Sequence, residues 1–202
     1  MPAEDRPQIY LVTPPEFELS QFPNDLARVL DDVDVACVRL DLATREEDRI
    51  LRAADACRAV TEPRDVALVL GEHVALSERA GLDGVHLTGA RGVRAARAAL
   101  GSDAIVGAAC GASRHDGMNA GEAGADYVAF GPVSGALGDG QLAEPDLFAW
   151  WSEVIEVPIV AEGGLDEEVV RTLWETTDFM AFREEVWRAD DPAGRLSALM
   201  SA

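Results

Sequence analysis

The sequence predicts a single (β/α)8 barrel, the TIM-barrel fold, that takes up residues 1–202 as one domain. Short apolar runs alternate along the chain with segments whose apolar residues recur at helical spacing, and eight such pairs are present. Strands that are separated by one helix each must be parallel, and eight parallel units close into a barrel. An open doubly wound sheet is the alternative, but no G-x-G-x-x-G motif follows the first apolar run. We therefore expect a barrel, with functional residues at the C-terminal ends of its strands.

The first half of the chain supplies four of the predicted strands. Its predicted strands are residues 9–12, 35–40, 66–70 and 84–87, and its predicted helices are 24–30, 45–60 and 74–80. Asn24 is the predicted N-cap of the first helix, because its side chain suits that position. The run 66–70 is apolar without interruption, as expected for a strand that is buried on both faces. Gly81 directly follows a helix and is a typical C-cap residue.

The second half repeats the pattern. Its predicted strands are residues 104–109, 127–130, 158–161 and 178–182, and its predicted helices are 93–100, 114–123, 145–153, 166–176 and 192–200. Gly101 is expected to end one helix, and Pro145 suits the first turn of another. The loop 134–140 contains three glycines and has the composition of a mobile lid.

Composition and charge exclude several classes of protein. The net charge is −20, so we expect no nucleic-acid partner, because binding to phosphates needs a basic surface. No apolar stretch approaches the ~18 residues of a membrane span. All 17 positive residues are arginines, which excludes Schiff-base chemistry and a P-loop lysine. The three cysteines have no paired spacing, and the first residues lack the pattern of a signal peptide, so we expect a cytoplasmic protein with reduced thiols.

Polar residues gather where the predicted strands end. They are Arg39, Asp41, Glu72, His73, His86, Arg91, Glu162, Arg183 and Glu184. Such a rim suits a divalent cation or a cationic ligand, and the alternative is that these residues are solvated loop residues that pair with one another. Imidazole titrates near neutrality, so His86 is a candidate acid–base residue; a hydrogen-bonded structural histidine is the alternative.

Several motifs together resemble one known family. They are Ile9-Tyr-Leu-Val-Thr13, Leu82-Asp-Gly-Val-His-Leu87, Gly124-Ala-Asp-Tyr-Val128, Phe130-Gly-Pro-Val133, Val157-Pro-Ile-Val-Ala161 and Gly163-Gly164. They occur in order over nearly the whole chain, and they resemble thiamine-phosphate synthase and its relative, the thiazole tautomerase. The resemblance implies a barrel enzyme that joins a pyrimidine pyrophosphate to a thiazole phosphate and releases pyrophosphate, with magnesium as cofactor.

The strand-end residues and the resemblance together give candidate roles for individual residues. Glu72 and His86 are the candidate catalytic residues, and Glu72 is also the candidate magnesium ligand. The candidate residues for binding the phosphorylated substrate are Gly131, Gly163, Gly164, Arg39, Arg183 and Glu184. We expect the N–H groups of Gly163 and Gly164 to face a phosphate at the start of the helix 166–176.

Other positions depart from the family pattern. Where the family has Gln-x-Arg-x-Lys after the second strand, this chain has Arg39, Asp41 and Ala43, and where the family has a second magnesium aspartate it has Arg91. Three functions therefore remain open: a synthase with a rebuilt site, an isomerase like the tautomerase, and a barrel that binds a phosphorylated metabolite without catalysis. The tryptophans on the predicted outer helices suit either the core or a homodimer contact.

Overall fold

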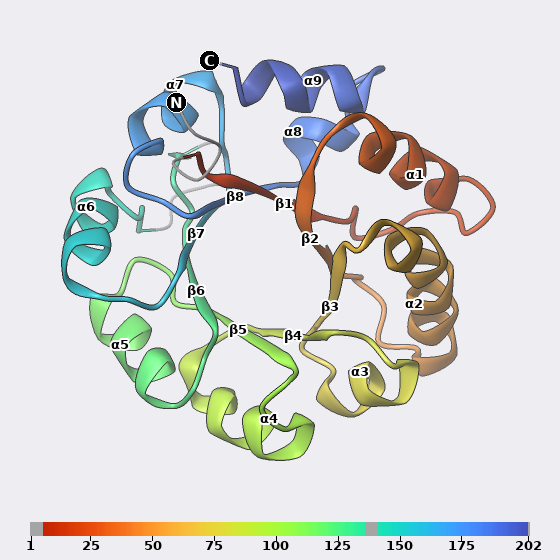
Figure 1. Ribbon diagram of the computed structural model, residues 1–202, viewed down its shortest axis with the longest axis horizontal. Helices are drawn as coiled ribbons and strands as arrows, with labels where there is room; N and C mark the ends of the chain where they lie inside the picture. The colour runs from red at the N-terminus through yellow and green to blue at the C-terminus, as the bar shows by residue number, and fades with distance from the viewer. Residues whose placement is uncertain (1–5, 136–140, 202) are drawn as a thin grey trace.

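The computed structural model of the chain is a closed ring of eight parallel strands surrounded by helices (Figure 1). It describes residues 6–135 and 141–201. Each strand pairs with the next one in the sequence, and β8 pairs with β1 to close the ring. The predicted (β/α)8 barrel is therefore confirmed. Part of the predicted lid, residues 136–140, lies outside the described residues.

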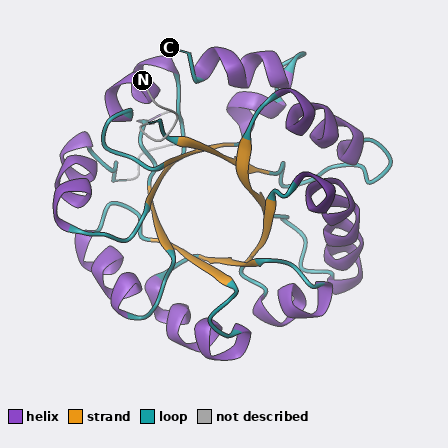
Figure 2. Ribbon diagram, viewed as in Figure 1, coloured by secondary structure: helices purple, strands orange, loops and turns teal. Residues whose placement is uncertain are grey.

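The strands and helices follow the predicted order. The strands are β1 (Gln8–Val12), β2 (Val35–Leu40), β3 (Ala67–Gly71), β4 (Gly84–Leu87), β5 (Ile105–Ala109), β6 (Tyr127–Phe130), β7 (Ile159–Glu162) and β8 (Phe179–Phe182). The helices are α1 (Phe22–Asp32), α2 (Glu47–Thr61), α3 (Val74–Ala80), α4 (Val93–Leu100), α5 (Arg114–Glu122), α6 (Pro145–Val154), α7 (Glu167–Leu173), α8 (Glu184–Trp187) and α9 (Pro192–Leu199). In Figure 2 the strands form the inner ring and the helices form the outer one. None of the described helices has the length and apolar character needed to cross a membrane.

The predicted ends of the helices are partly right. Gly81 and Gly101 end α3 and α4 with positive φ angles of 62° and 85°, as expected for glycine C-caps. The prediction that Asn24 is an N-cap is wrong, because α1 begins at Phe22 with Gln21 as its N-cap. Pro23 occupies the first turn, where its fixed φ favours the helix and its missing N–H costs nothing.

Two apolar layers hold the barrel together. The larger layer fills the space between the strands and the helices, and the smaller one fills the interior of the ring with side chains such as Tyr10, Val69, Tyr127 and Val160. Gly107 on β5 makes room for this interior, because a Cβ there would lie 2.0 Å from Cζ of Tyr127. The interior is thus a packed core, and the open space lies beyond the C-terminal ends of the strands.

Candidate active site at the barrel mouth

A hollow of about 400 Å³ lies at the C-terminal ends of the strands, over β1, β2, β6, β7 and β8. It brings together five of the predicted binding residues: Arg39, Gly131, Gly163, Arg183 and Glu184. Glu162 and Glu185 also line it. Because parallel strands all end at the same rim, residues that are more than 140 positions apart in the sequence meet here.

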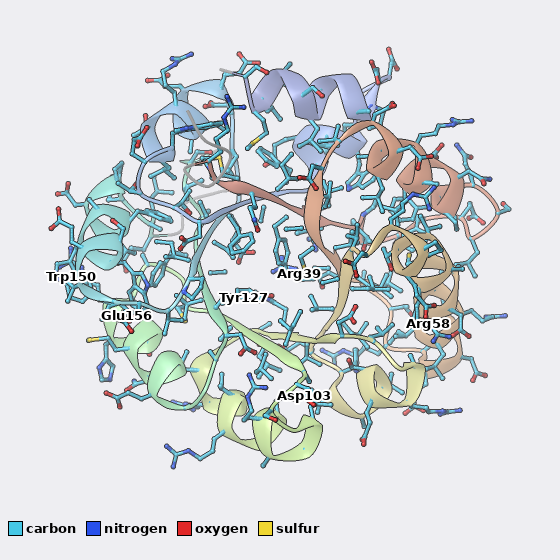
Figure 3. The ribbon with its side chains drawn as sticks, in the orientation of Figure 1. Arg39, Arg58, Asp103, Tyr127, Trp150 and Glu156 are labelled. Carbon is cyan, nitrogen blue, oxygen red and sulfur yellow. The ribbon has the colours of Figure 1, made fainter. Side chains whose placement is uncertain are left out.

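Arg39 forms the floor of this hollow. Its side chain extends from β2 into the ring (Figure 3) and is only 9% exposed. Nη1 donates to Oε2 of Glu162 at 3.0 Å, Nε lies 3.6 Å from Oδ2 of Asp41, and Cζ lies 5.8 Å from the ring centre of Tyr10. Burial alone would lower the pKa of Arg39, but the charges of Glu162 and Asp41, together with the nearby tyrosines, raise it overall. Arg39 is therefore a fixed positive charge at the base of the site.

Arg183 is the second cation of the hollow. It is the N-cap residue of the short helix α8, and its Nη2 donates to Oδ2 of Asp41. Asp41 is itself held by its N–H, which donates to Oγ1 of Thr13 at 3.1 Å. Among the buried side-chain nitrogen and oxygen atoms of the described residues, those without a hydrogen-bond partner are Nε of Arg39 and Nε of Arg183. Two buried N–H donors without an acceptor are costly unless a ligand supplies oxygen atoms to them.

The glycine pair Gly163-Gly164 follows β7 directly and precedes α7. Helix α7 begins at Glu167, and the Asp166 side chain accepts the N–H groups of its first turn. Gly164 has a φ of 88°, and its N–H donates to Oε1 of Glu185 at 3.0 Å. In this structure an internal carboxylate accepts the Gly164 N–H group, and phosphate binding by the pair stays a prediction.

Glu185 itself was missed by sequence reasoning. Its other oxygen, Oε2, accepts the N–H of Arg183 at 3.0 Å. Helix α8 has four residues, too few to show helical periodicity in the sequence. The direct pairing of β7 with β8 brings the residues after β8 beside the loop after β7.

Glu72 lines a second hollow at the same rim, of about 660 Å³, over the ends of β3, β4 and β5. Arg91, Cys110 and Asp116 line it as well. Glu72 has a left-handed backbone with a φ of 64°, and its carboxylate accepts the N–H of Thr88. Its own N–H donates to the carbonyl of His86 at 2.9 Å. Glu72 thus ties the loop after β3 to the end of β4.

The described residues do not assemble a magnesium site of their own. Within residues 6–135 and 141–201, no three His, Cys, Asp or Glu side chains come together in a way that could hold a metal ion. One carboxylate oxygen of Glu72, the predicted ligand, already accepts a main-chain N–H. Magnesium in phosphate sites is usually held by one or two carboxylates plus the substrate phosphates, so Glu72 as a magnesium ligand stays a prediction.

His86 lies away from both hollows, inside the ring. It is 5% exposed, and its Nδ1 lies 2.9 Å from the hydroxyl oxygen of Tyr127, which lies 2.7 Å from the hydroxyl oxygen of Tyr10. Burial lowers the pKa of His86 well below its usual value, and the positive charges of Arg39 and Arg183 lower it further. This geometry favours a neutral, structural histidine over an acid–base residue.

Comparison with known proteins identifies the family. The family described as thiamine monophosphate synthase matches residues 9–186 of the chain. A protein of Rhodospirillum centenum named thiamine-phosphate synthase is 43% identical over 197 residues, which cover 95% of this chain and 94% of the relative. A protein of the same name from Erythrobacter litoralis is 37% identical over 194 residues, which cover 92% of this chain and 91% of the relative. The chain belongs to the thiamine monophosphate synthase family.

Solved structures of the same fold include one from this family. The thiamine phosphate pyrophosphorylase of Pyrococcus furiosus superposes with a TM-score of 0.81 over 96% of this chain and 95% of its own, at 19% identity. A 3-hexulose-6-phosphate synthase superposes with a TM-score of 0.66 at 17% identity, over 95% of this chain and 98% of its own. Structural likeness at these identities shows the fold alone, so the function has to be argued from the site.

The barrel mouth of this chain is acidic. Two arginines, Arg39 and Arg183, face four carboxylates in and beside the hollow: Asp41, Glu162, Glu184 and Glu185. The guanidinium groups are held in place by these carboxylates, while the Nε–H of each makes no hydrogen bond. The site is therefore able to bind anionic oxygen atoms at two fixed points, within surroundings that repel a high negative charge.

Proposed function

We propose that the chain catalyses the condensation of the thiamine-phosphate synthase type, in which a pyrimidine pyrophosphate is joined to a thiazole with release of pyrophosphate. The observation that carries the proposal is that the buried Nε–H groups of Arg39 and Arg183 make no hydrogen bond, at the mouth of a barrel of this family. The 43% identity to a named thiamine-phosphate synthase over nearly the whole chain supports it.

The arginines have a defined task in this reaction. As the bond to pyrophosphate breaks, negative charge grows on the departing oxygens, and fixed guanidinium donors stabilise that charge. Asp41 and Glu162 hold Arg39 and Arg183 in position, so little reorganisation is needed during the reaction. In this proposal the two arginines stabilise the departing pyrophosphate, and His86 takes no part in the reaction.

Two hollows at one rim also suit a reaction with two substrates. The hollow over β1, β2 and β6 to β8 has a volume of about 400 Å³, and the one over β3 to β5 has about 660 Å³. Each volume is in the range of small-molecule sites. Bringing two bound substrates together converts a bimolecular step into one between held groups, which lowers the barrier.

The proposal includes a phosphorylated small molecule as substrate and a cytoplasmic location. All three cysteines, Cys37, Cys57 and Cys110, are free and buried, which supports a reducing compartment. Burial raises the pKa of each of these thiols to about 12, so they remain protonated at neutral pH.

The experiment is an assay of pyrophosphate release with both substrates present, with each substrate alone, and with and without magnesium. Release that needs both substrates and falls at least tenfold in Arg183→Gln is the expected result. A second candidate function is binding without catalysis. The hydrogen bond from the Gly164 N–H to Glu185 favours this candidate. Saturable binding of a substrate without pyrophosphate release under any of these conditions would establish the second candidate.

A further inference from the structure

The aromatic ring of Tyr10 lies beneath Arg39, the arginine that forms the floor of the 400 Å³ hollow. Val12 on β1 is the register partner of Arg39, and Tyr10 precedes Val12 by two residues, so Tyr10 faces the interior one step deeper. Cζ of the guanidinium lies 5.8 Å from the centre of the ring, within the ~6 Å reach of a cation–π contact. Tyr10 is 2% exposed, so the contact is shielded from water and correspondingly strong.

The carboxylates and the ring hold different parts of the Arg39 guanidinium. Glu162 and Asp41 contact its nitrogen atoms, at 3.0 Å from Nη1 and 3.6 Å from Nε. A planar group that is held at its edge can still tilt about these contacts, whereas a ring packed against Cζ limits the tilt. The Nε–H bond lies in the plane of the guanidinium, and this N–H makes no hydrogen bond within the protein. The ring of Tyr10 therefore helps to set the direction in which this donor points.

Tyr10 is itself fixed by contacts inside the barrel, where Tyr127 and Arg39 both lie (Figure 3). Its hydroxyl oxygen lies 2.7 Å from that of Tyr127, which lies 2.9 Å from Nδ1 of His86. The two tyrosine rings meet edge to face, with their centres 5.7 Å apart. Burial raises the pKa of Tyr10 well above its usual value, and Tyr127 raises it further. The phenol therefore stays neutral, and Tyr10 contacts Arg39 through its ring and not as a phenolate.

We propose that Tyr10 is a positioning residue for the reaction: its ring holds the guanidinium of Arg39 from beneath, so that the Nε–H of this arginine is directed at the pyrophosphate. The proposal rests on the proposed function for the identity of the ligand. Tyr10 touches no reacting atom and acts through Arg39. The alternative is that Tyr10 only fills the core, in which case its replacement changes the stability of the fold and leaves the affinity for pyrophosphate unchanged.

The test is calorimetric binding of inorganic pyrophosphate to the full chain, with and without magnesium. Tyr10→Phe keeps the ring and removes the hydroxyl group, whereas Tyr10→Leu removes the ring. Tyr10→Met replaces Tyr10→Leu if the leucine variant does not fold, because methionine adapts to irregular space. Urea denaturation verifies that each variant is folded.

Two further variants separate positioning from packing. Phe179→Leu is the matched control, because Phe179 packs against the same interior cluster from the N-terminal end of β8. Among the described residues, the rings that lie under an arginine are those of Tyr10 and Trp150, so this control removes no such contact. Tyr10→Leu combined with Arg39→Gln completes a double-mutant cycle, which measures whether Tyr10 acts through the arginine.

We expect Tyr10→Leu to weaken pyrophosphate binding about fivefold or more, as for the loss of a shielded cation–π contact. Tyr10→Phe and Phe179→Leu should each change the affinity less than about twofold, and so should Tyr10→Leu when Arg39→Gln is already present. An unchanged affinity in Tyr10→Leu, or an equal loss in Tyr10→Phe, in Phe179→Leu or in the Arg39→Gln background, would overturn the proposal. No binding of pyrophosphate to the wild-type chain would overturn it as well.

These readings need no turnover, so they are independent of the assay of pyrophosphate release. The expected pattern of affinities without any release from the two substrates would support the positioning role of Tyr10 and count against the proposed reaction. Release that is accompanied by equal affinities in all the Tyr10 variants would support the reaction and overturn the positioning role.

Discussion

Arg39 on β2 and Glu162 on β7 form an ion pair across the mouth of the barrel, with 3.0 Å between Nη1 and Oε2. The two residues are 123 positions apart in the sequence, and their side chains are 9% and 22% exposed. A pair this shielded loses more from the removal of one partner than a surface pair does, because the remaining charge stays buried.

Replacing Glu162 with alanine should therefore destabilise the fold. We expect a loss of about 2–3 kcal/mol in the free energy of unfolding, at the lower end for buried pairs because Glu162 is partly exposed. Urea denaturation measures it. Glu167→Ala is the control, since it breaks the exposed pair with Arg195 and should cost less than about 1 kcal/mol. Equal losses of unfolding free energy in the two variants would show that the buried pair stabilises the fold no more than the exposed pair does.

Arg183 should matter for the reaction more than for the fold. Arg183→Gln removes a donor from the hollow, and we expect kcat/KM for pyrophosphate release to fall about 10- to 100-fold, as for the loss of a charged hydrogen bond. Steady-state kinetics give the value. Arg188→Gln, which removes a 78%-exposed charge from the end of α8, is the control and should change kcat/KM less than threefold. If Arg183→Gln kept the wild-type kcat/KM, this arginine would have no role in the reaction.

The lowered pKa of His86 makes stability depend on pH. In the unfolded chain the imidazole takes up a proton as the pH falls below about 6.5, whereas the buried imidazole does not, so the folded state loses stability as the pH falls. The loss is at most about 1.4 kcal/mol per pH unit for one such group. Urea midpoints between pH 7.5 and pH 5 should fall less steeply in His86→Gln than in the wild type. Identical slopes in the two proteins would argue against a buried neutral histidine.

Gly107 should tolerate no side chain. An added Cβ would lie 2.0 Å from Cζ of Tyr127 inside the ring, so Gly107→Ala should cost about 1–3 kcal/mol or more of stability, as other overpacked cores do. Thermal or urea unfolding provides the measurement. Gly89→Ala is the matched control, because its extended backbone has a φ of 177° and a Cβ there meets nothing within 4 Å. The interior packing would have to be looser than described if both variants were equally stable.

The sequence predicted the barrel because its signals are local. Apolar runs, glycine C-caps such as Gly81 and Gly101, and the strict alternation of strands and helices each depend on neighbouring residues. The N-cap prediction at Asn24 was wrong because Pro23 favours a helix that begins at Phe22, one residue before the proline. The N-cap preference of the Asn24 side chain does not take this effect of Pro23 into account.

The candidate site was predicted in outline only. Parallel strands bring Arg39, Arg183 and Glu184 to one rim, so their proximity follows from the fold class. Their partners do not follow from it. The bridge from Glu185 to Gly164 depends on a four-residue helix, and the pairing of His86 with Tyr127 depends on which way side chains face inside the ring. Such contacts are set by packing between distant segments, which no local pattern records.

The most direct test of the account is pyrophosphate release by the wild-type chain supplied with the pyrimidine pyrophosphate and a thiazole, phosphorylated or not. The account predicts release that requires both substrates and declines at least tenfold when Arg183 is changed to glutamine. No release with either thiazole, with or without magnesium, would contradict it.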